Sequence, residues 1–124
     1  MFEDLLKKQF KHGGRGDKEY DCYGLAMIIR ERVNKPIPDI YSPLCNKEEF
    51  IHNAILQKKD LFTRLSQPEP FSIVAFKIHP KYVSHIGIVL SDSVSFIHIM
   101  KDTRVSIERL DRPEWSKRVE GFYT

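Results

Sequence analysis

Hydrophobic and polar positions recur with a helical period in the first part of the chain. Apolar residues three to four positions apart predict a short amphipathic helix over residues 2–10 and a second helix from Cys22 to about Val33. A third helix is predicted over residues 46–58, where a capping-box pattern precedes another apolar stripe. We therefore expect the first half of the chain to be mainly helical.

The hydrophobic period changes to two after the proline-containing segment at residues 67–70. Short connections at residues 91–93 and 101–103 suit hairpins between neighbouring strands. Helices followed by strands indicate an α+β fold, in which N-terminal helices pack on one face of a C-terminal antiparallel β-sheet. The predicted strands cover residues 71–77, 84–91, 94–100, 104–110 and 119–123.

Length and composition favour a single domain that spans residues 1–124. A chain of 124 residues, with 41% hydrophobic and 30% charged residues, can bury one core. No apolar run approaches the roughly 20 residues that a membrane-spanning helix needs. The formal net charge of +3 comes from scattered basic residues. We therefore expect no membrane anchor and no nucleic-acid partner.

The first eight residues lack the uninterrupted apolar core of a secretory signal. We expect the chain as given to be made and kept in the cytoplasm, unless a phage particle carries it out. Its two cysteines, Cys22 and Cys45, are then expected to be free thiols, with Cys45 in a packing role. None of the paired Cys or His spacings of zinc sites occurs, so no metal and no cofactor is expected.

Cys22 is the main candidate for a reactive residue. A loop with three glycines, residues 13–16, leads toward it, and it stands at the start of a predicted helix. Free backbone N–H groups and the positive end of the helix dipole favour a thiolate there. Asp21 is placed to cap the helix, although its negative charge opposes ionisation of the thiol. A free cysteine on an apolar face is also a common core residue, so a packing role stays open.

Two predicted strands each carry a histidine. Because alternate residues of a strand share a face, the face to which each histidine belongs can be assigned. His85 belongs to the strand at residues 84–91, and His98 belongs to the strand at residues 94–100. If these strands are neighbours, the two rings can face the same side. One histidine would then take the thiol proton and give it to the leaving amine, and the other would orient the first. The histidines expected at the surface or in loops are His12, His52 and His79.

Five short segments follow one another in a recognisable series: Phe10-Lys11-His12-Gly13-Gly14, Asp21-Cys22-Tyr23-Gly24-Leu25, residues 67–76, residues 84–90 and Phe96-Ile97-His98. The second resembles the Asp-Cys-Ser-Gly-Leu/Phe nucleophile motif of the NlpC/P60 family, and the first resembles the Tyr-x-x-Gly-Gly segment before it. The fourth resembles the Gly-His-Val-Gly-Ile-Tyr strand of the catalytic histidine. With a similar closing strand, the resemblance runs from about residue 10 to residue 123.

This resemblance implies a papain-like fold and a cysteine peptidase. By it, Cys22 is the nucleophile, His85 is the general base and acid, and His98 is the third, orienting member. The family's usual reaction hydrolyses amide bonds in bacterial cell-wall (peptidoglycan) stem peptides through a thioester acyl-enzyme, so a peptidoglycan peptide is the implied substrate. A protonated His85 is expected to lower the thiol pKa well below its usual value of about 8.5.

The motifs also mark candidate substrate-binding residues, some of which depart from the family pattern. Tyr23 stands in place of the family's serine, and Ser84 stands in place of its glycine. Phe10 replaces a tyrosine of the cell-wall enzymes and cannot offer a hydroxyl. The aromatic residue after the cysteine and the pattern at residues 115–123 look most like the small phage tail-assembly branch, which implies phage tail proteins as partners. The candidate substrate-binding residues are Phe10, Gly14, Tyr20, Asp21, Tyr23 and Ser84.

Two other interpretations stay open. The chain can be a structural or assembly module that keeps the fold without effective catalysis, which the phenyl ring of Phe10 motivates. It can also be a zinc protein that binds the metal through Cys22, His85 and His98. Comparison of thiol labelling at Cys22 and Cys45 tests the first alternative, and metal analysis tests the second.

Overall fold

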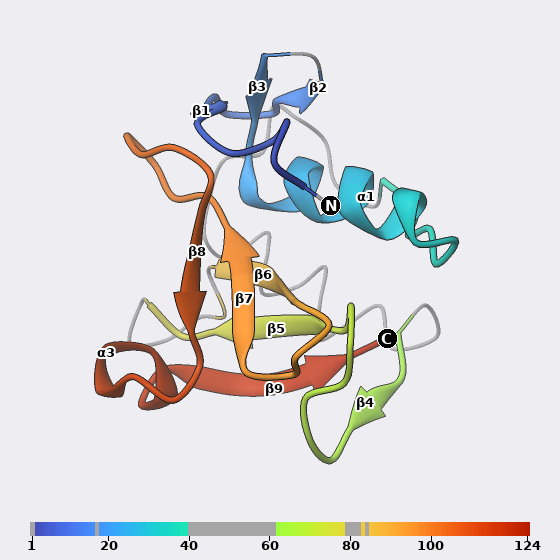
Figure 1. The fold of residues 1–124 in the computed structure, drawn as a ribbon, viewed down its shortest axis with the longest axis vertical. Coiled ribbons are helices and arrows are strands. Elements are labelled where there is room, and N and C mark those ends of the chain that lie inside the picture. Colours follow the sequence, from blue (N-terminus) through green and yellow to red (C-terminus); the bar gives the residue numbers. More distant parts are fainter. Residues whose placement is uncertain (1, 17, 40–61, 79–82, 84) are drawn as a thin grey trace.

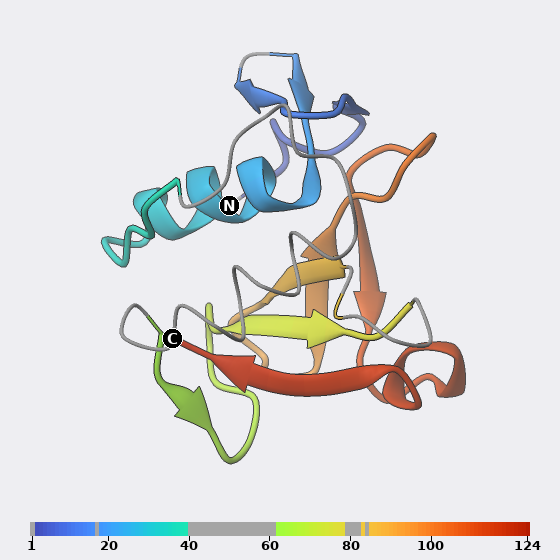
Figure 2. The same ribbon diagram turned by 180° about the vertical axis from the view of Figure 1, so that it is seen from behind.

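The computed structural model describes residues 2–16, 18–39, 62–78, 83 and 85–124. Helix α1 (Cys22–Arg32) lies between a small three-stranded sheet and a larger six-stranded sheet (Figure 1). The view from behind shows the same succession of the three parts (Figure 2). Within the described ranges, no helix is long and apolar enough to cross a membrane.

The larger sheet has the strand order β4-β9-β5-β6-β7-β8, and all of its neighbouring strands pair antiparallel. Strands β5 to β9 correspond to the predicted strands, and turns occupy both predicted hairpin connections. The fold is therefore α+β with an antiparallel sheet, as predicted. The strands are β4 (Arg64–Leu65), β5 (Ile73–Phe76), β6 (His85–Val89), β7 (Ser95–His98), β8 (Ser106–Arg109) and β9 (Val119–Tyr123).

Among the described residues, three short strands precede α1, and a short helix lies directly before β9. Strand β3 (Glu19–Tyr20) pairs parallel with β1 (Gln9–Phe10) and antiparallel with β2 (Arg15–Gly16), and it leads directly into α1. Helix α3 (Pro113–Ser116) begins with a proline, whose fixed φ suits a first helical turn. A strand of two residues or a helix of a single turn carries too few positions for its period to show, so the sequence pattern did not predict these elements.

The helix predicted over residues 2–10 is wrong, because this segment forms turns and then enters β1. Lys7 has a φ of 76°, which a right-handed helix does not contain, and its N–H bonds to the Val105 carbonyl at 3.4 Å. A helix this short is marginal in water, so pairing with a distant part of the chain prevails. Phe2 and Leu5 are nevertheless buried, so the apolar pattern identified core residues correctly.

The helix predicted from Cys22 is confirmed, since α1 runs from Cys22 to Arg32 and Val33 is its C-cap. The helix predicted over residues 46–58 lies outside the described residues. The same is true of Cys45, His52, His79 and Ser84.

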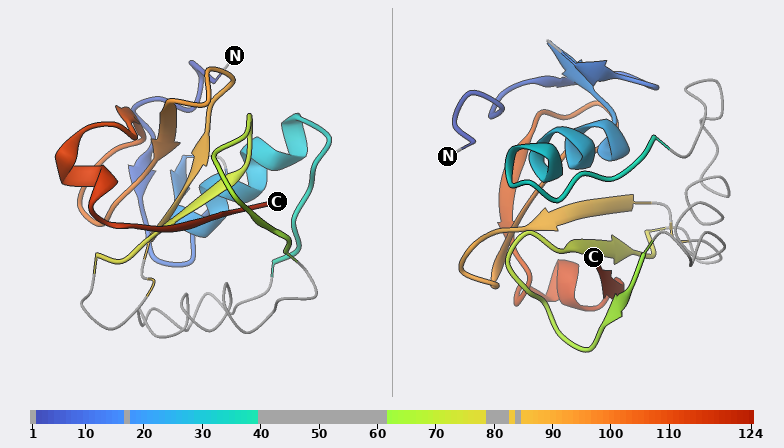
Figure 3. Two further views of the ribbon diagram at one scale, coloured as in Figure 1. Left: turned by 90° about the horizontal axis from the view of Figure 1, so that it is seen from below. Right: turned by 90° about the vertical axis from the view of Figure 1, so that its right-hand side faces the viewer.

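Two hydrophobic clusters lie on the two faces of the larger sheet. Alternate strand residues enter different clusters, so that Ile86 and Ile88 of β6 pack with α1, whereas Val89 packs on the opposite side. Figure 3 shows α1 and α3 on opposite sides of β5 and β6. The cluster on the α1 side includes Leu25, Ala26, Ile29, Ile73, Ile86, Ile88 and Ile97, and the other consists of Val74, Phe76, Val89, Phe96 and Trp115.

Candidate active site

Two glycines let the backbone of the loop before α1 contact the backbone of the helix's first turn. A Cβ atom at Gly24 would collide with the Gly14 carbonyl oxygen, and a Cβ atom at Gly14 would come within 2.8 Å of the Tyr20 Cα atom. The Gly14 carbonyl also accepts a hydrogen bond from the Asp21 N–H at 3.2 Å. Only residues without a Cβ atom fit at these two positions, which fix the place where the helix begins.

Asp21 is the N-cap of α1, as predicted. Its Oδ1 atom accepts hydrogen bonds from the Gly24 N–H at 2.6 Å and from Arg15 Nη1 at 2.7 Å, and its Oδ2 atom accepts one from the Gly13 N–H at 3.2 Å. Arg15 also donates through Nε to Asp39 Oδ2 at 3.0 Å. Asp21 therefore sets the backbone direction immediately before Cys22, and Arg15 offsets part of its negative charge.

Cys22 is a free thiol at the first position of α1, and only 6% of its surface is exposed. Burial, followed by the charge of Asp21, raises the pKa of the thiol to about 12, although the backbone N–H groups of Ile86 and Tyr23 lower it. His85 is neutral here and does not act on this pKa, so the lowering expected from a protonated His85 within hydrogen-bond reach stays a prediction. The loss of water around the sulfur disfavours the thiolate, and it outweighs the two N–H groups at the sulfur.

His85 and His98 face each other, which confirms the prediction from strand period. The Nε2 atom of His85 lies 2.8 Å from the Nδ1 atom of His98, and each residue is only 4% exposed. Phe76 stacks on His85 with ring centroids 5.6 Å apart. Burial, with the charge of His98 as a smaller cause, lowers the pKa of His85 to about 3, and burial lowers the pKa of His98 to about 4. Both rings are therefore neutral near pH 7.

The pairing of β6 with β7 stops before the histidines. The pair nearest to them joins Ile88 to Ile97. The N–H of Leu90 points toward β7, where it donates to the Ser95 carbonyl at 2.8 Å. Because N–H groups two residues apart on a strand point to the same side, the N–H of Ile86 also points toward β7, beyond that pair.

The Cys22 sulfur lies at this Ile86 N–H, so the thiol reaches β6 one residue from His85. The helix packs on one face of the sheet, and the histidine rings pack with Phe76 and Trp115 on the other face. No hydrogen bond between Sγ and the His85 ring occurs in the part of the chain that the structure describes. Since His98 uses the Nε2 atom of His85, Nδ1 is the nitrogen that remains for the thiol.

Gly87 makes room for His98 beside His85. A Cβ atom at Gly87 would come within 3.0 Å of Phe96 Cδ2, 3.1 Å of the Ile97 carbonyl oxygen and 3.3 Å of His98 Cβ. Such distances require the neighbouring strand to move. The glycine two residues after His85 therefore allows β7 to place His98 within hydrogen-bond distance.

Two aromatic residues that the sequence analysis left out of the site pack on the histidines. Phe76 pairs with His85 across β5 and β6, so strand alternation could have found it once the strand order was known. Trp115 has its ring centroid 4.9 Å from that of His98, at an interplanar angle of 83°. It lies on the four-residue helix α3, for which no sequence period exists.

Most of the candidate substrate-binding residues lie in the scaffold around the helix start. Tyr23 is completely buried and its hydroxyl donates to the Pro38 carbonyl at 2.5 Å, while Tyr20 is buried at the end of β3. Phe10 is half-buried, and its ring packs edge-on against His12 at 5.1 Å. Phe10 is thus the one candidate among the described residues with a partly exposed side chain. The buried candidates are Gly14, Tyr20, Asp21 and Tyr23, and their substrate contacts stay predictions.

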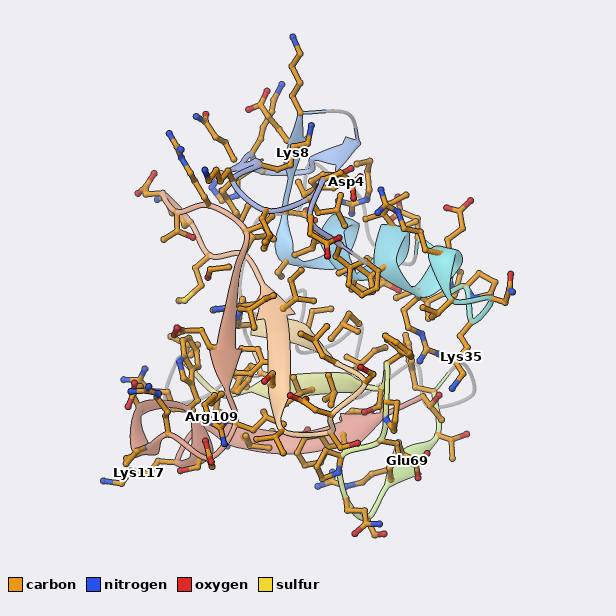
Figure 4. The ribbon with its side chains drawn as sticks, viewed as in Figure 1. Asp4, Lys8, Lys35, Glu69, Arg109 and Lys117 are labelled. Atoms are coloured by element: carbon orange, nitrogen blue, oxygen red, sulfur yellow. The ribbon has the colours of Figure 1, made fainter. Side chains whose placement is uncertain are left out.

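Within the described ranges, no group of three His, Cys, Asp or Glu side chains is placed to hold a metal ion. Cys22, His85 and His98 therefore do not form the ligand set of the zinc alternative. The labelled side chains of Lys8, Lys35 and Lys117 point outward at well-separated places (Figure 4).

The sequence model of the NlpC/P60 family matches residues 7–124. A similar solved structure is that of a "similar to lipoprotein, NLP/P60 family" protein from Staphylococcus aureus subsp. aureus Mu50, with a TM-score of 0.67 and 16% sequence identity. The match covers 97% of this chain and 37% of that protein, so the chain spans well under half of its length. At this identity the likeness shows the fold. Among curated proteins, no sequence matches this chain.

Proposed function

The chain belongs to the NlpC/P60 family, whose members are generally cell-wall peptidases, and we propose that it hydrolyses amide bonds in peptidoglycan stem peptides through a thioester on Cys22. The observation that carries the proposal is the 2.8 Å contact between His85 Nε2 and His98 Nδ1, one residue from the place where the Cys22 sulfur meets β6. In this proposal Cys22 is the nucleophile, His85 is the base and His98 is the orienting group.

Proton transfer requires one particular pair of tautomers. For Nδ1 of His85 to accept the thiol proton, Nε2 of His85 must carry the proton and donate it to Nδ1 of His98. His98 then holds its own proton on Nε2. The contact with His98 thus keeps the lone pair of His85 on the nitrogen that the thiol can reach.

The reaction begins from a neutral thiol and a neutral imidazole. As Sγ attacks the carbonyl carbon of the peptide, its proton passes to Nδ1 of His85, and the resulting imidazolium gives that proton to the leaving amine when the C–N bond breaks. Water then attacks the thioester carbon while His85 takes one of its protons. The C–S bond breaks, the acyl group leaves as a carboxylic acid, and His85 returns the proton to Sγ. Hydrogen bonds of this kind often form only in the substrate complex, so the hydrogen bond between Sγ and Nδ1 forms as substrate enters.

The helix start also provides hydrogen-bond donors for the oxyanion. Cys22 is the first residue of α1, and the N–H groups of a first helical turn have no partner inside the helix. The Cys22 N–H donates to the developing oxyanion in this proposal, supported by the positive end of the helix dipole.

The test replaces the reacting groups one at a time. Cys22→Ala and His85→Ala should abolish hydrolysis of purified muropeptides, measured by release of cleaved peptide, while far-ultraviolet circular dichroism stays at the wild-type level. Cys45→Ala serves as the matched control and should keep wild-type hydrolysis. Full activity of either folded variant at the first two positions would contradict the mechanism.

A second candidate function is an assembly module without effective catalysis. The raised thiol pKa of about 12 favours it, because a buried neutral thiol is a poor nucleophile. Chloroacetamide labelling at pH 7 followed by peptide mass spectrometry separates the two functions. Labelling of Cys22 no faster than that of Cys45 supports the module, and clearly faster labelling supports the peptidase.

The phage tail context is a finer part of the proposal. Its support is the aromatic Tyr23 after the nucleophile and the closing pattern of residues 115–123. Synthesis in the cytoplasm, a place in the virion and binding to phage tail proteins stay predictions. Detection of the protein in purified phage particles by mass spectrometry would support them.

A further inference from the structure

We propose that Glu108 and Trp115 form a positioning pair for the two histidines, in which Trp115 holds the Glu108 carboxylate where its negative charge stabilises a protonated histidine pair. This inference rests on the proposed thiol chemistry of Cys22 and adds two residues to it. Neither residue touches the substrate or the reacting sulfur in this proposal. Both act through His98.

The side chain of Trp115 fixes the position of the carboxylate. Its indole Nε1 donates a hydrogen bond to Glu108 Oε2 at 2.8 Å. The same indole ring packs edge-on against the His98 ring at 4.9 Å and lies 6.4 Å from the His85 ring. Trp115 is buried on helix α3, so one rigid side chain contacts the histidine and the carboxylate together.

The register of the sheet brings Glu108 to the same region. His98 on β7 pairs with Ser106 on β8, and Phe96 pairs with Glu108. Residues two apart on a strand share a face, so Glu108 is the diagonal neighbour of His98 on the side where Phe96 and Trp115 pack. Its charge acts on His98 and raises the pKa of that ring against the effect of burial.

Among the described residues, Glu108 is the charged group that acts on the pair. From the neighbouring elements, β5 contributes Phe76, β7 contributes Phe96, and α1 contributes the neutral thiol of Cys22. The other titratable group at each histidine is its partner histidine. The Glu108 side chain is only partly buried, but the histidine pair on which its charge acts is buried. Water therefore screens this interaction less than it screens two surface charges.

The carboxylate matters when the thiol proton moves. The step turns a neutral pair, Cys22 and His85, into a thiolate and an imidazolium. The 2.8 Å bond shares the positive charge of the imidazolium with His98, which is the ring that Glu108 acts on. Glu108 therefore increases the fraction of thiolate at neutral pH without acting on the sulfur itself.

The experiment measures the rate of Cys22 alkylation by chloroacetamide between pH 6 and pH 10.5 by mass spectrometry of the intact protein and its peptides. Glu108→Gln keeps an acceptor for the Trp115 N–H and removes the charge. It should slow alkylation at pH 7 by about three- to tenfold, the change that a shift of half to one unit in the pKa of the histidine pair produces. Toward the alkaline end the difference from the wild type should shrink, because hydroxide then removes the thiol proton directly from a growing fraction of molecules and no imidazolium forms.

Three further variants separate charge from structure. Glu108→Asp retains the charge and should recover much of the rate, and Trp115→Phe keeps the ring but removes the N–H donor and should slow alkylation at pH 7 in the same sense. Glu114→Gln removes an exposed charge from the same helix and should leave the rate unchanged. Equal rates for Glu108→Gln and the wild type at pH 7, or a loss of the same size at every pH, would overturn the proposal.

Alkylation needs no peptide, so this test is independent of the proposed substrate. If the wild type alkylates at Cys22 with the expected dependence on Glu108 but cleaves no muropeptide, the proposed hydrolysis fails and the positioning pair stands. If the wild type cleaves muropeptides but Glu108→Gln does not change the alkylation rate, the positioning pair fails and the proposed hydrolysis stands.

Discussion

Neutral histidines in a buried pair make the stability of this protein depend on pH. Burial lowers the pKa of His85 from 6.5 to about 3 and that of His98 from 6.5 to about 4. Below pH 6.5 the unfolded chain binds protons that the folded protein does not, so the free energy of unfolding falls as pH falls. The stability that the neutral histidines contribute is fully present above pH 6.5. It is lost as the pH falls from 6.5 to their pKa values in the folded protein.

Each buried histidine should therefore cost about 1.4 kcal/mol of unfolding free energy per pH unit between roughly pH 6 and pH 4. Urea unfolding at pH 7, 6 and 5 measures this slope. His98→Gln removes one titrating ring, and its curve should be flatter than that of the wild type. An equally steep curve for the variant would show that other groups cause the acid sensitivity.

Gly87 offers a second test at the scale of one residue. Gly87→Ala places a Cβ atom within 3.0 Å of Phe96 and 3.3 Å of His98 Cβ, so the neighbouring atoms of β7 must give way by a few tenths of an ångström. We expect this shift to disturb the contact between His98 and His85. We expect a destabilisation of about 1–3 kcal/mol and a loss of hydrolysis of roughly tenfold or more. Gly16→Ala is the control, since no atom lies within 4 Å of a Cβ there. Wild-type hydrolysis by Gly87→Ala would contradict the role given to the His85–His98 contact.

At the scale of one element, the start of α1 sets both the position and the ionisation of the nucleophile. Asp21 caps the helix and raises the thiol pKa by its charge, whereas Arg15 lowers it. The capping role helps catalysis by positioning the nucleophile, whereas the negative charge opposes formation of the thiolate. The Arg15–Asp21 ion pair, at 2.7 Å, reduces the conflict without removing the cap.

This arrangement predicts opposite effects for two substitutions. Asp21→Asn keeps a capping side chain and removes the charge, so it should lower the thiol pKa and speed chloroacetamide alkylation of Cys22 at pH 8 by about two- to tenfold. Arg15→Gln should slow it. Thermal unfolding of both variants serves as the control for helix damage, and effects of the same sign would refute the electrostatic account.

At the scale of the whole molecule, α1 is connected to the sheet by a buried arginine as well as by apolar packing. Arg30 donates to the carbonyls of Lys35 and Phe71 at 2.8 Å, and to Thr124 Oγ1 at 3.3 Å. These contacts join the end of the helix to the segment before β5 and to the C-terminal residue of the chain. The helix is thus held at both ends, by the glycine contact near Cys22 and by Arg30.

Arg30→Met should destabilise the protein by about 2–4 kcal/mol, because buried carbonyl oxygens lose their donors. Arg32→Met is the matched control on the same helix. It removes a partly exposed pair with Asp4, at 2.6 Å, and should cost less than about 1 kcal/mol. Urea unfolding measures the free energy of unfolding of both variants. Losses of similar size would show that the buried hydrogen bonds of Arg30 contribute no more to stability than a surface ion pair.

The amino-acid sequence by itself determined the helix from Cys22, the strands β5 to β9 and the shared face of His85 and His98. These features depend on spacing of three to four residues or of two, and such periods are local properties of a chain. The order of the motifs also identified the family that the match over residues 7–124 confirms.

The tertiary structure alone decided the rest. Residues 2–10 form turns and β1 because β1 pairs with β3 and because residues 7–10 also bond to the backbone of residues 103–105, nearly a hundred positions away. Cys22 is neutral because packing removes water from its sulfur, and Trp115 reaches His98 from a four-residue helix. Desolvation and contacts between distant segments arise only when the whole chain has folded, so no period in the sequence contains them.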